Sequence, residues 1–312
     1  MAEHSLPAMP THSRWNRDLQ PRREIAAGDT VHFACLDASG GQVKPGSGLE
    51  DFLAIDRDRI HALTGPVFVK GAEPGDVLEV EVLSVKHKGW GWTSTIAGLG
   101  FLDERFTEPS LFHWDLDGAV SRSLAPAVLP LRPFCGVMGV CPVEPGEHRT
   151  RPPGVFGGNL DVRELSAGAT LYLPVQVAGA MFSCGDAHAA QGDGEVCING
   201  IECPAKVSLR FMLHKGRALA GPLLESAARG VAGPAWMVLE SNADALTAAR
   251  GATSRMVDLL VANWEFAPEH AYVLCSVAMN LHLSQVVNEP MITVSAVIPK
   301  SILPARRLFA TQ

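Results

Sequence analysis

Hydrophobic and polar residues alternate along several short stretches in the first two thirds of the chain. In residues 77–85, valines alternate with Glu79 and Glu81 directly after a Gly-Asp turn, which is the period-two pattern of a half-buried strand. Residues 170–177 show a similar alternation, although Pro174 indicates an edge strand or a bulge because proline cannot donate a ladder hydrogen bond. The pattern predicts a body built mainly of β-strands.

A different pattern begins near Gly233. Residues 243–264 carry apolar side chains at near-helical spacing, and residues 268–279 open with a proline and continue without a breaker. Apolar runs at 236–240 and 292–298 flank these two predicted helices and are typical of strands. The expected stripe of the first helix consists of Leu246, Met256, Leu259, Leu260 and Trp264. The sequence thus predicts a β-rich body over 1–232 and a small α+β unit over 233–312.

Composition and charge narrow the classes of protein that remain. Of the 312 residues, 47% are hydrophobic and 19% are charged, which excludes disorder for most of the chain. The net charge of −7, with no basic block longer than a pair, argues against nucleic acid as a partner. We find neither a membrane-length apolar run nor a secretory signal, so we expect a cytoplasmic protein that binds no membrane. The 7 cysteines, without a CxxC pair, are typical of buried reduced thiols.

The densest polar cluster lies in residues 180–195, within an otherwise apolar stretch. If extended, Asp186 and His188 project to the same side with Cα atoms roughly 6.5 Å apart, a span that two ligands of one metal can bridge. Glycines at 185, 192 and 194 allow tight bends that return Gln191, Asp193 and Glu195 toward the same place. The alternative is a polar hairpin whose acids are solvated.

Two further groups matter only if the fold brings them together, and one cysteine is a separate candidate. His32 and Asp37 flank the end of an apolar run, where a strand delivers side chains to a site. The alternative for His32 is a strand histidine whose ring nitrogens are hydrogen-bonded within the sheet and have no role in a site. Asn159 and Asp161 share a face if extended, and an Asx turn is the alternative. Cys184 is a poor candidate nucleophile, because it ends an apolar run close to an acid that raises the thiol pKa.

Several segments together resemble the acetamidase/formamidase family over almost the whole chain. They are Thr64–Val69 with the Gly75-Asp76 turn, the Pro-Pro-Gly and Gly-Gly-Asn-Leu-Asp segments at 152–161, the run GDAHAAQGDGEV at 185–196, and segments 271–277, 283–287 and 297–300. The resemblance implies a mainly β fold with jelly-roll and barrel-like parts, a homodimer, and hydrolysis of short amides. It also implies a divalent metal, commonly zinc, with calcium as a possible second ion. The chain departs from the family pattern at Asn280, His282 and Cys141, which leaves the substrate more open than the family.

Amide hydrolysis needs a polarised carbonyl, an activated water and a proton for the leaving amine, and one metal can supply the first two. We expect Asp186 and His188 as first ligands, with Asp161, Asp37 and His32 as further candidates. Glu195, or else Glu202, is the expected acid-base group, and Asn159 and Gln191 are expected to hold the amide. The alternatives are hydrolysis of another amide, an imide or a cyclic urea, a small-amide binding protein without turnover, and a purely structural β domain.

Overall fold

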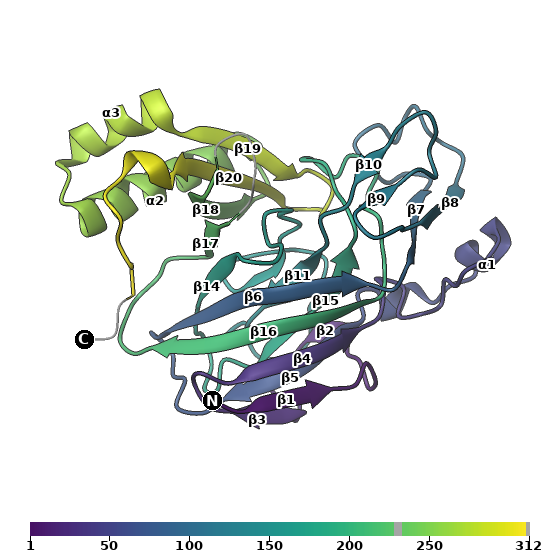
Figure 1. The fold of residues 1–312 in the computed structure, drawn as a ribbon, viewed down its shortest axis with the longest axis horizontal. Coiled ribbons are helices and arrows are strands. Elements are labelled where there is room, and N and C mark those ends of the chain that lie inside the picture. The colour runs from purple at the N-terminus through teal and green to yellow at the C-terminus, as the bar shows by residue number, and fades with distance from the viewer. Residues whose placement is uncertain (228–232, 310–312) are drawn as a thin grey trace.

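Two mixed β-sheets form the body of the protein in a computed structural model that describes residues 1–227 and 233–309 (Figure 1). Neighbouring strands are antiparallel except for two parallel pairs, β1 with β4 and β3 with β5. The larger sheet has nine strands in the order β1 (Glu3–Leu6), β4 (Thr30–Cys35), β16 (Ala205–His214), β6 (Val77–His87), β14 (Thr170–Pro174), β17 (Leu223–Ser226), β18 (Ala235–Asn242), β20 (Ile292–Pro299) and β19 (Asn280–Gln285).

The smaller sheet carries most of the residues singled out by the sequence. Its five strands run in the order β13 (Gly157–Asn159), β11 (Phe134–Gly139), β15 (Phe182–His188), β5 (Leu63–Val69) and β3 (Arg23–Ile25). Three two-stranded ribbons project from the body: β2 (Arg14–Trp15) with β12 (His148–Arg149), β7 (Trp90–Thr95) with β8 (Ser110–Asp115), and β9 (Val120–Ser121) with β10 (Leu129–Pro130). A short helix α1 (Leu49–Leu53) and two 3₁₀ turns, Arg57–Arg59 and Lys300–Ile302, complete this part.

The main core lies between the two sheets, where apolar faces of both are buried. Phe182 of the smaller sheet packs edge-on against Phe33 and Phe211 of the larger one, with ring centroids 6.2 and 5.1 Å apart. All three rings are almost completely buried, and each such ring contributes strongly to the burial of apolar surface. This packing holds the smaller sheet, and therefore the residues of β15, in a fixed position.

The helix pair covers the other end of the larger sheet, at the upper left of Figure 1. Helix α2 (Ala245–Trp264) packs on β18 and β20, and α3 (Pro268–Ala278) packs on α2. Asp244 caps α2 by accepting a hydrogen bond from the Thr247 backbone N–H at 2.7 Å. The residues of α2 that are fully buried recur every fourth position: Ala248, Ala252, Met256 and Leu260.

The prediction of a mainly β protein with two C-terminal helices is confirmed, and two details differ. Leu246 does not belong to the buried stripe of α2, because 66% of it is exposed. Pro174 does not mark an edge strand: β14 lies between β6 and β17, and Pro174 is its last residue, beyond the part that pairs with β17. The predicted division near Gly233 falls between β17 and β18, which pair with each other.

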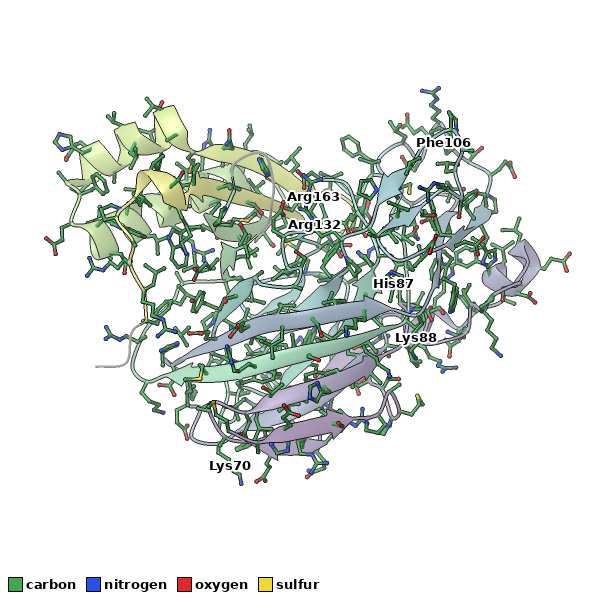
Figure 2. All side chains as sticks on the ribbon, viewed as in Figure 1. Lys70, His87, Lys88, Phe106, Arg132 and Arg163 are labelled. Carbon is green, nitrogen blue, oxygen red and sulfur yellow. The ribbon has the colours of Figure 1, made fainter. Side chains whose placement is uncertain are left out.

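Figure 2 shows the loop between β7 and β8 at the end of the molecule opposite the helix pair, with Phe106 on it. The Phe106 side chain is 51% exposed, and Phe101 and Leu102 in the same loop are 61% and 51% exposed.

Within residues 1–227 and 233–309, no helix has the length and apolar character that crossing a membrane requires.

The burial pattern of α2 predicts opposite outcomes for two of its apolar residues. Met256→Ala leaves a cavity against β18 and β20 and is expected to lower the free energy of unfolding by about 2–5 kcal/mol. Leu246→Ala, the matched control on the exposed side, is expected to change it by less than about 0.5 kcal/mol. Urea titrations followed by circular dichroism measure both, and equal losses would show that α2 presents another face to the sheet.

Candidate active site

Strand β15 carries Asp186 and His188 into the interior of the protein. The strand is paired on both sides, with β11 and with β5, and all seven of its residues are buried. The His188 ring stands edge-on to Phe134 of β11, with centroids 5.1 Å apart and planes at 89°. Asp186 is not extended as expected, because its φ is +53°. Both side chains nevertheless lie in one buried cluster.

Three acids from other segments join this cluster. Glu202 Oε1 lies 2.9 Å from His188 Nε2, and Asp186 Oδ1 lies 3.6 Å from the same nitrogen. Asp161 Oδ1 lies 3.7 Å from His188 Nδ1, and Glu195 completes a second group with His188 and Glu202. Within each group, Asp161–Asp186–His188 and His188–Glu195–Glu202, one ligand atom per residue lies within 4.8 Å of the others. Either group could therefore hold a metal ion.

A glycine of β11 leaves space beside these side chains. A Cβ at Gly136 would lie 2.3 Å from Asp161 Oδ1, 2.9 Å from Asp186 Oδ2 and 3.0 Å from His188 Cε1. No larger residue fits there without moving the carboxylates. The absence of a side chain at 136 is thus a condition for the close approach of Asp161, Asp186 and His188.

Many polar atoms of the cluster lack a hydrogen-bond partner. In the part of the chain that the structure describes, the buried side-chain atoms without one include Asp161 Oδ1, Asp186 Oδ1, His188 Nε2, Glu195 Oε2 and Glu202 Oε2. Buried polar groups are normally paired, since an unpaired one costs roughly 1–3 kcal/mol. Such a concentration of free acceptor atoms in one place fits the ligand shell of a cation.

Burial and mutual repulsion shift the pKa values of these acids. Burial, reinforced by the neighbouring Asp161, raises the pKa of Glu195 well above its usual range. Burial also raises the pKa of Asp161 and of Glu202. Asp186 differs: although burial acts to raise its pKa, the charges of His61 and His188 hold the pKa below the usual range. The cluster therefore combines acids that bind protons readily with one that stays ionised.

Gln191 fixes the orientation of His188 and does not face the cavity. Its side-chain Nε2 donates to the backbone oxygen of Asp161 at 2.8 Å, so its Oε1 accepts the hydrogen bond from His188 Nδ1 at 2.8 Å. When the ring is neutral, this pairing keeps its proton on Nδ1 and turns Nε2 toward Glu202 and Asp186, as in many metal-binding histidines. In this structure Gln191 has a positioning role toward His188, and its expected contact with a substrate amide stays a prediction.

Asn159, in contrast, lines the cavity. Its Nδ2 donates to the backbone oxygen of Arg151 at 3.2 Å, and its Oδ1 is buried without a hydrogen-bond partner. Asn288, from the turn after β19, donates to the backbone oxygen of Asn159 at 3.1 Å and to Asp161 Oδ2 at 2.5 Å. The C-terminal segment thus helps to hold two residues of the site.

Two of the expected ligands lie outside the cluster. Asp37 is buried, but its carboxylate accepts hydrogen bonds from the Ser39 backbone N–H at 3.0 Å and from Trp92 Nε1 at 3.3 Å. His32 lies on β4, where its ring contacts Ser208 Oγ at 2.8 Å and Glu3 at 3.6 Å. Asp37 therefore holds a turn and the wall of the cavity, while the half-exposed His32 side chain joins β4 to the neighbouring strands β1 and β16 of the larger sheet.

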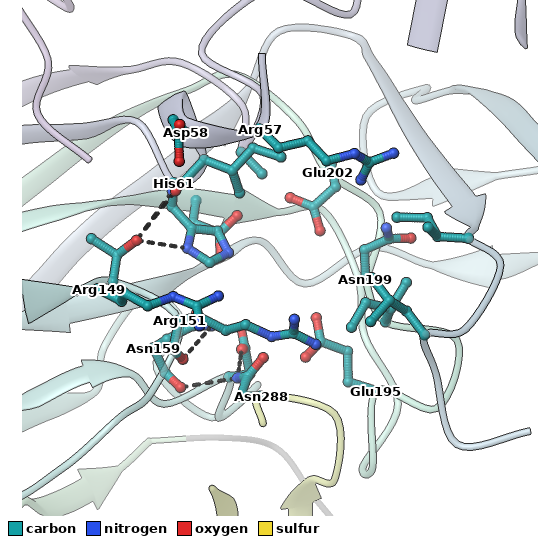
Figure 3. A pocket seen from close by; sticks show the side chains of 18 of the residues that line it. Arg57, Asp58, His61, Arg149, Arg151, Asn159, Glu195, Asn199, Glu202 and Asn288 are labelled. Carbon is teal, nitrogen blue, oxygen red and sulfur yellow. Dashed lines mark hydrogen bonds and ion pairs between the residues drawn. The ribbon is translucent and has the colours of Figure 1, made fainter. Parts of the chain in front are cut away.

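Other residues of the site were not found from the sequence. His61 Nε2 lies 3.9 Å from Asp186 Oδ2, and the other ring nitrogen lies 3.3 Å from Thr150 Oγ1. Arg149 and Arg151 also line the cavity, which has a volume of about 340 Å³ (Figure 3). His61 stands just before the segment Thr64–Val69, which was noted only for its family resemblance. The spacing along the chain carries no signal that His61 meets Asp186.

Cys184 has no access to this cavity. It is fully buried, and burial raises the pKa of its thiol well above the usual range. All 7 cysteines are free, and six of them are buried. The structure thus agrees with the prediction of free, mostly buried thiols.

Comparisons with known proteins show which family the chain resembles along most of its length. The sequence pattern of the acetamidase/formamidase family matches residues 3–148 and 144–305. A formamidase of Methylophilus methylotrophus is 29% identical over 65% of this chain and 64% of its own, so the chain spans just under two thirds of that relative's length. The crystal structure of an acetamidase from Bacillus halodurans superposes with a TM-score of 0.88 at 32% identity, covering 96% of this chain and 98% of that one. A gamma lactamase from Delftia acidovorans superposes with a TM-score of 0.67 at 26% identity, over 96% and 91%.

The hydrogen bond between Gln191 and His188 predicts a change that is visible in the ring itself. In Gln191→Ala the Nδ1–H loses its acceptor, so the ring is expected to leave the single Nδ1–H tautomer and stability to fall by about 1–3 kcal/mol. Ring ¹⁵N chemical shifts report the tautomer. Gln176→Ala, the matched control, removes an amide whose Oε1 accepts a hydrogen bond from the Val143 backbone N–H at 3.1 Å. Unchanged His188 shifts in Gln191→Ala would rule out the positioning role.

Proposed function

The chain belongs to the acetamidase/formamidase family, and we therefore propose that it is a metal-dependent amidase that cleaves short-chain amides to a carboxylate and ammonia. One observation carries the metal dependence: Asp161, Asp186 and His188 converge beside Gly136 with acceptor atoms that lack hydrogen bonds. Burying several carboxylates together is strongly unfavourable unless protons or a cation compensate them.

The donor set favours zinc. Two carboxylate oxygens and one imidazole nitrogen form a three-ligand set, and catalytic zinc sites keep a fourth position open. Calcium is less suited to this group, because it prefers shells made of oxygen atoms alone. When bound, zinc would polarise the amide carbonyl and lower the pKa of a coordinated water to about 7.

Glu195 is suited to move the proton. Its side chain lines the cavity, one carboxylate oxygen has no hydrogen bond, and burial raises its pKa above the usual range, so it binds a proton more readily than an exposed glutamate. In the proposed reaction Glu195 accepts a proton from water and returns it to the nitrogen of the leaving group, a contribution of roughly 10²- to 10⁴-fold in rate. Glu202 is the second choice, because one of its oxygens already faces His188 Nε2.

Asn159 is suited to orient the substrate. Its unpaired Oδ1 is an acceptor for an N–H of a primary amide, and its Nδ2 is held by the backbone oxygen of Arg151. A neutral acceptor matches an uncharged carboxamide without adding to the negative charge of the cluster. We propose that Asn159 turns the carbonyl of the amide toward Asp161, Asp186 and His188.

A second substrate class keeps support from the likeness to the gamma lactamase of Delftia acidovorans. A cyclic amide has the same scissile C–N bond, and the cavity of about 340 Å³ is within the size range of small-ligand pockets. An imide or a cyclic urea belongs to the same alternative. A binding protein without turnover would give saturable amide binding and no ammonia.

Ammonia release from formamide and acetamide tests the proposal. We expect the purified protein to release ammonia from at least one of them, chelation to abolish the release, and added zinc to restore it, because the acids and His188 need the cation to act. The same assay with a γ-lactam and a cyclic urea separates the second substrate class. Release that persists when metal analysis finds the protein free of metal would contradict the metal dependence.

Variants of the cluster separate metal loss from proton transfer. Asp186→Ala and His188→Ala are expected to lose bound metal and turnover together, since each removes a ligand. Glu195→Gln is expected to keep its metal and to lower kcat by about 10²- to 10⁴-fold. Asp193→Asn, an exposed neighbour that pairs with Arg163, is the control. Full activity of Glu195→Gln would transfer the acid-base role to another group.

The gap at Gly136 provides a separate prediction. In Gly136→Ala the new methyl group occupies the space between Asp161, Asp186 and His188, so metal binding is expected to weaken by at least about tenfold, a cost of about 1.4 kcal/mol. Gly192→Ala is the matched control, because nothing lies within 4 Å of its Cβ position. Zinc titration followed by the rise in Tm measures both, and equal rises would show that the ion does not occupy this gap.

A further inference from the structure

The cavity above the acidic cluster is bordered by arginine side chains. Arg14, Arg57, Arg149 and Arg151 all line it, whereas the buried acids form its inner part. Figure 3 shows Arg149 and Arg151 extending across the cavity, with Arg57 on the opposite side. The cavity therefore has a negative end, where the amide would react, and a positive end at its rim.

The positive charge at the rim is only partly compensated. Arg14 pairs with Asp58 at 3.0 Å, and Arg57 lies 5.9 Å over the Phe52 ring. Arg151 donates to the Val287 backbone oxygen at 3.0 Å. Among residues 1–227 and 233–309, no carboxylate lies within 4.0 Å of the guanidinium groups of Arg57, Arg149 or Arg151, so the Arg14–Asp58 ion pair is the one that this rim makes.

The strand pairing at the rim forces two like charges together. Arg14 of β2 and Arg149 of β12 are directly opposite in the antiparallel ribbon. Like charges in such a pair destabilise the ribbon. An anion bound beside Arg149 would offset this repulsion, and arginine is the side chain best shaped to hold a carboxylate through two parallel hydrogen bonds.

The size of the cavity exceeds what the smallest amides need. At about 340 Å³ it falls in the range of pockets that enclose whole metabolites, whereas formamide has three non-hydrogen atoms. A ligand that fills the cavity would reach from the buried acids to the exposed Arg149 at the rim and would pass Arg151, whose side chain extends toward Glu195 (Figure 3). Its two ends would need different chemistry.

We propose that the preferred substrate is an amide that carries a carboxylate at its other end, a monoamide of a dicarboxylic acid, with Arg149 and Arg151 as the residues that bind this carboxylate. The proposal rests on the amidase function proposed above. In the reaction, water adds its oxygen to the carbonyl carbon, the C–N bond breaks, and ⁻O₂C–R–CONH₂ plus H₂O gives the dicarboxylate and ammonium.

Succinamate and succinamide provide the test, because they share a length and differ in whether the far end is a carboxylate or a neutral amide. With the metal-loaded protein we expect kcat/KM to be about 10- to 100-fold higher for succinamate, the worth of a charge-assisted pair. Arg149→Met and Arg151→Met are each expected to lower this ratio by about tenfold or more. Arg217→Met, an exposed arginine far along the chain from the rim, is expected to keep it.

Two further measurements keep the test decisive. Arg149→Lys preserves the charge without the paired N–H groups. Its ratio of kcat/KM for succinamate to kcat/KM for succinamide should therefore fall between those of the wild type and Arg149→Met. Melting curves check that both variants are folded. Calorimetric binding of succinate to the metal-loaded protein should weaken in Arg149→Met and Arg151→Met. Inorganic phosphate that binds as tightly as succinate would mark a general anion site and overturn the substrate assignment.

The outcomes distinguish this inference from the function on which it rests. If the wild type releases ammonia from both amides with nearly equal kcat/KM for succinamate and succinamide, the inference is overturned and the proposed amidase function stands. Equal losses for both amides in Arg149→Met and Arg151→Met would assign these residues to charge balance of the buried acids and also overturn it. No ammonia from formamide, acetamide, succinamide or succinamate would overturn the proposed amidase itself.

Discussion

The burial of four carboxylates around one histidine is the constraint on which the rest of this structure depends. Asp161, Asp186, Glu195 and Glu202 are each at most 6% exposed, and water cannot compensate their charge. Each must instead be held by the chain, by a proton or by a cation. His188 is central to this arrangement because both of its ring nitrogens lie within 4 Å of carboxylate oxygens.

The arrangement needs precise support, and much of it comes from residues far from the chemistry. Strand β15 pairs with β11 on one side and with β5 on the other, and Phe182 at its start packs in the core between the sheets. The C-terminal unit also contributes, since the backbone oxygen of Ser284 accepts a hydrogen bond from Gly194 at 3.0 Å, next to Glu195. The helices that cover β18 and β20 therefore help to fix the edge strand β19 and the loop of Glu195.

Charge is separated along the cavity as well as concentrated at its inner end. The acids lie on the buried sheet, where the protein excludes water, whereas the arginines lie on a two-stranded ribbon and on loops at the rim. Interactions of the buried groups are strong and little screened in the low dielectric of the interior. Those at the rim are weakened by solvent, so they suit the recognition of a ligand more than the stabilisation of the fold.

The sequence alone determined the parts of this protein that depend on local periodicity and on residue type. Alternation predicted β6, helical spacing and Pro268 predicted α2 and α3, and the pair Asp186 and His188 was found from its Asp-x-His spacing within a polar cluster. Only the tertiary structure decided what Asp37, His32 and Gln191 contact, because register and neighbouring strands set the direction of a side chain. His61, Arg149 and Asn288 reach the site from distant segments, and no spacing along the chain encodes such a meeting. Convergence of this kind is produced by the packing of whole sheets and loops, which local sequence does not contain.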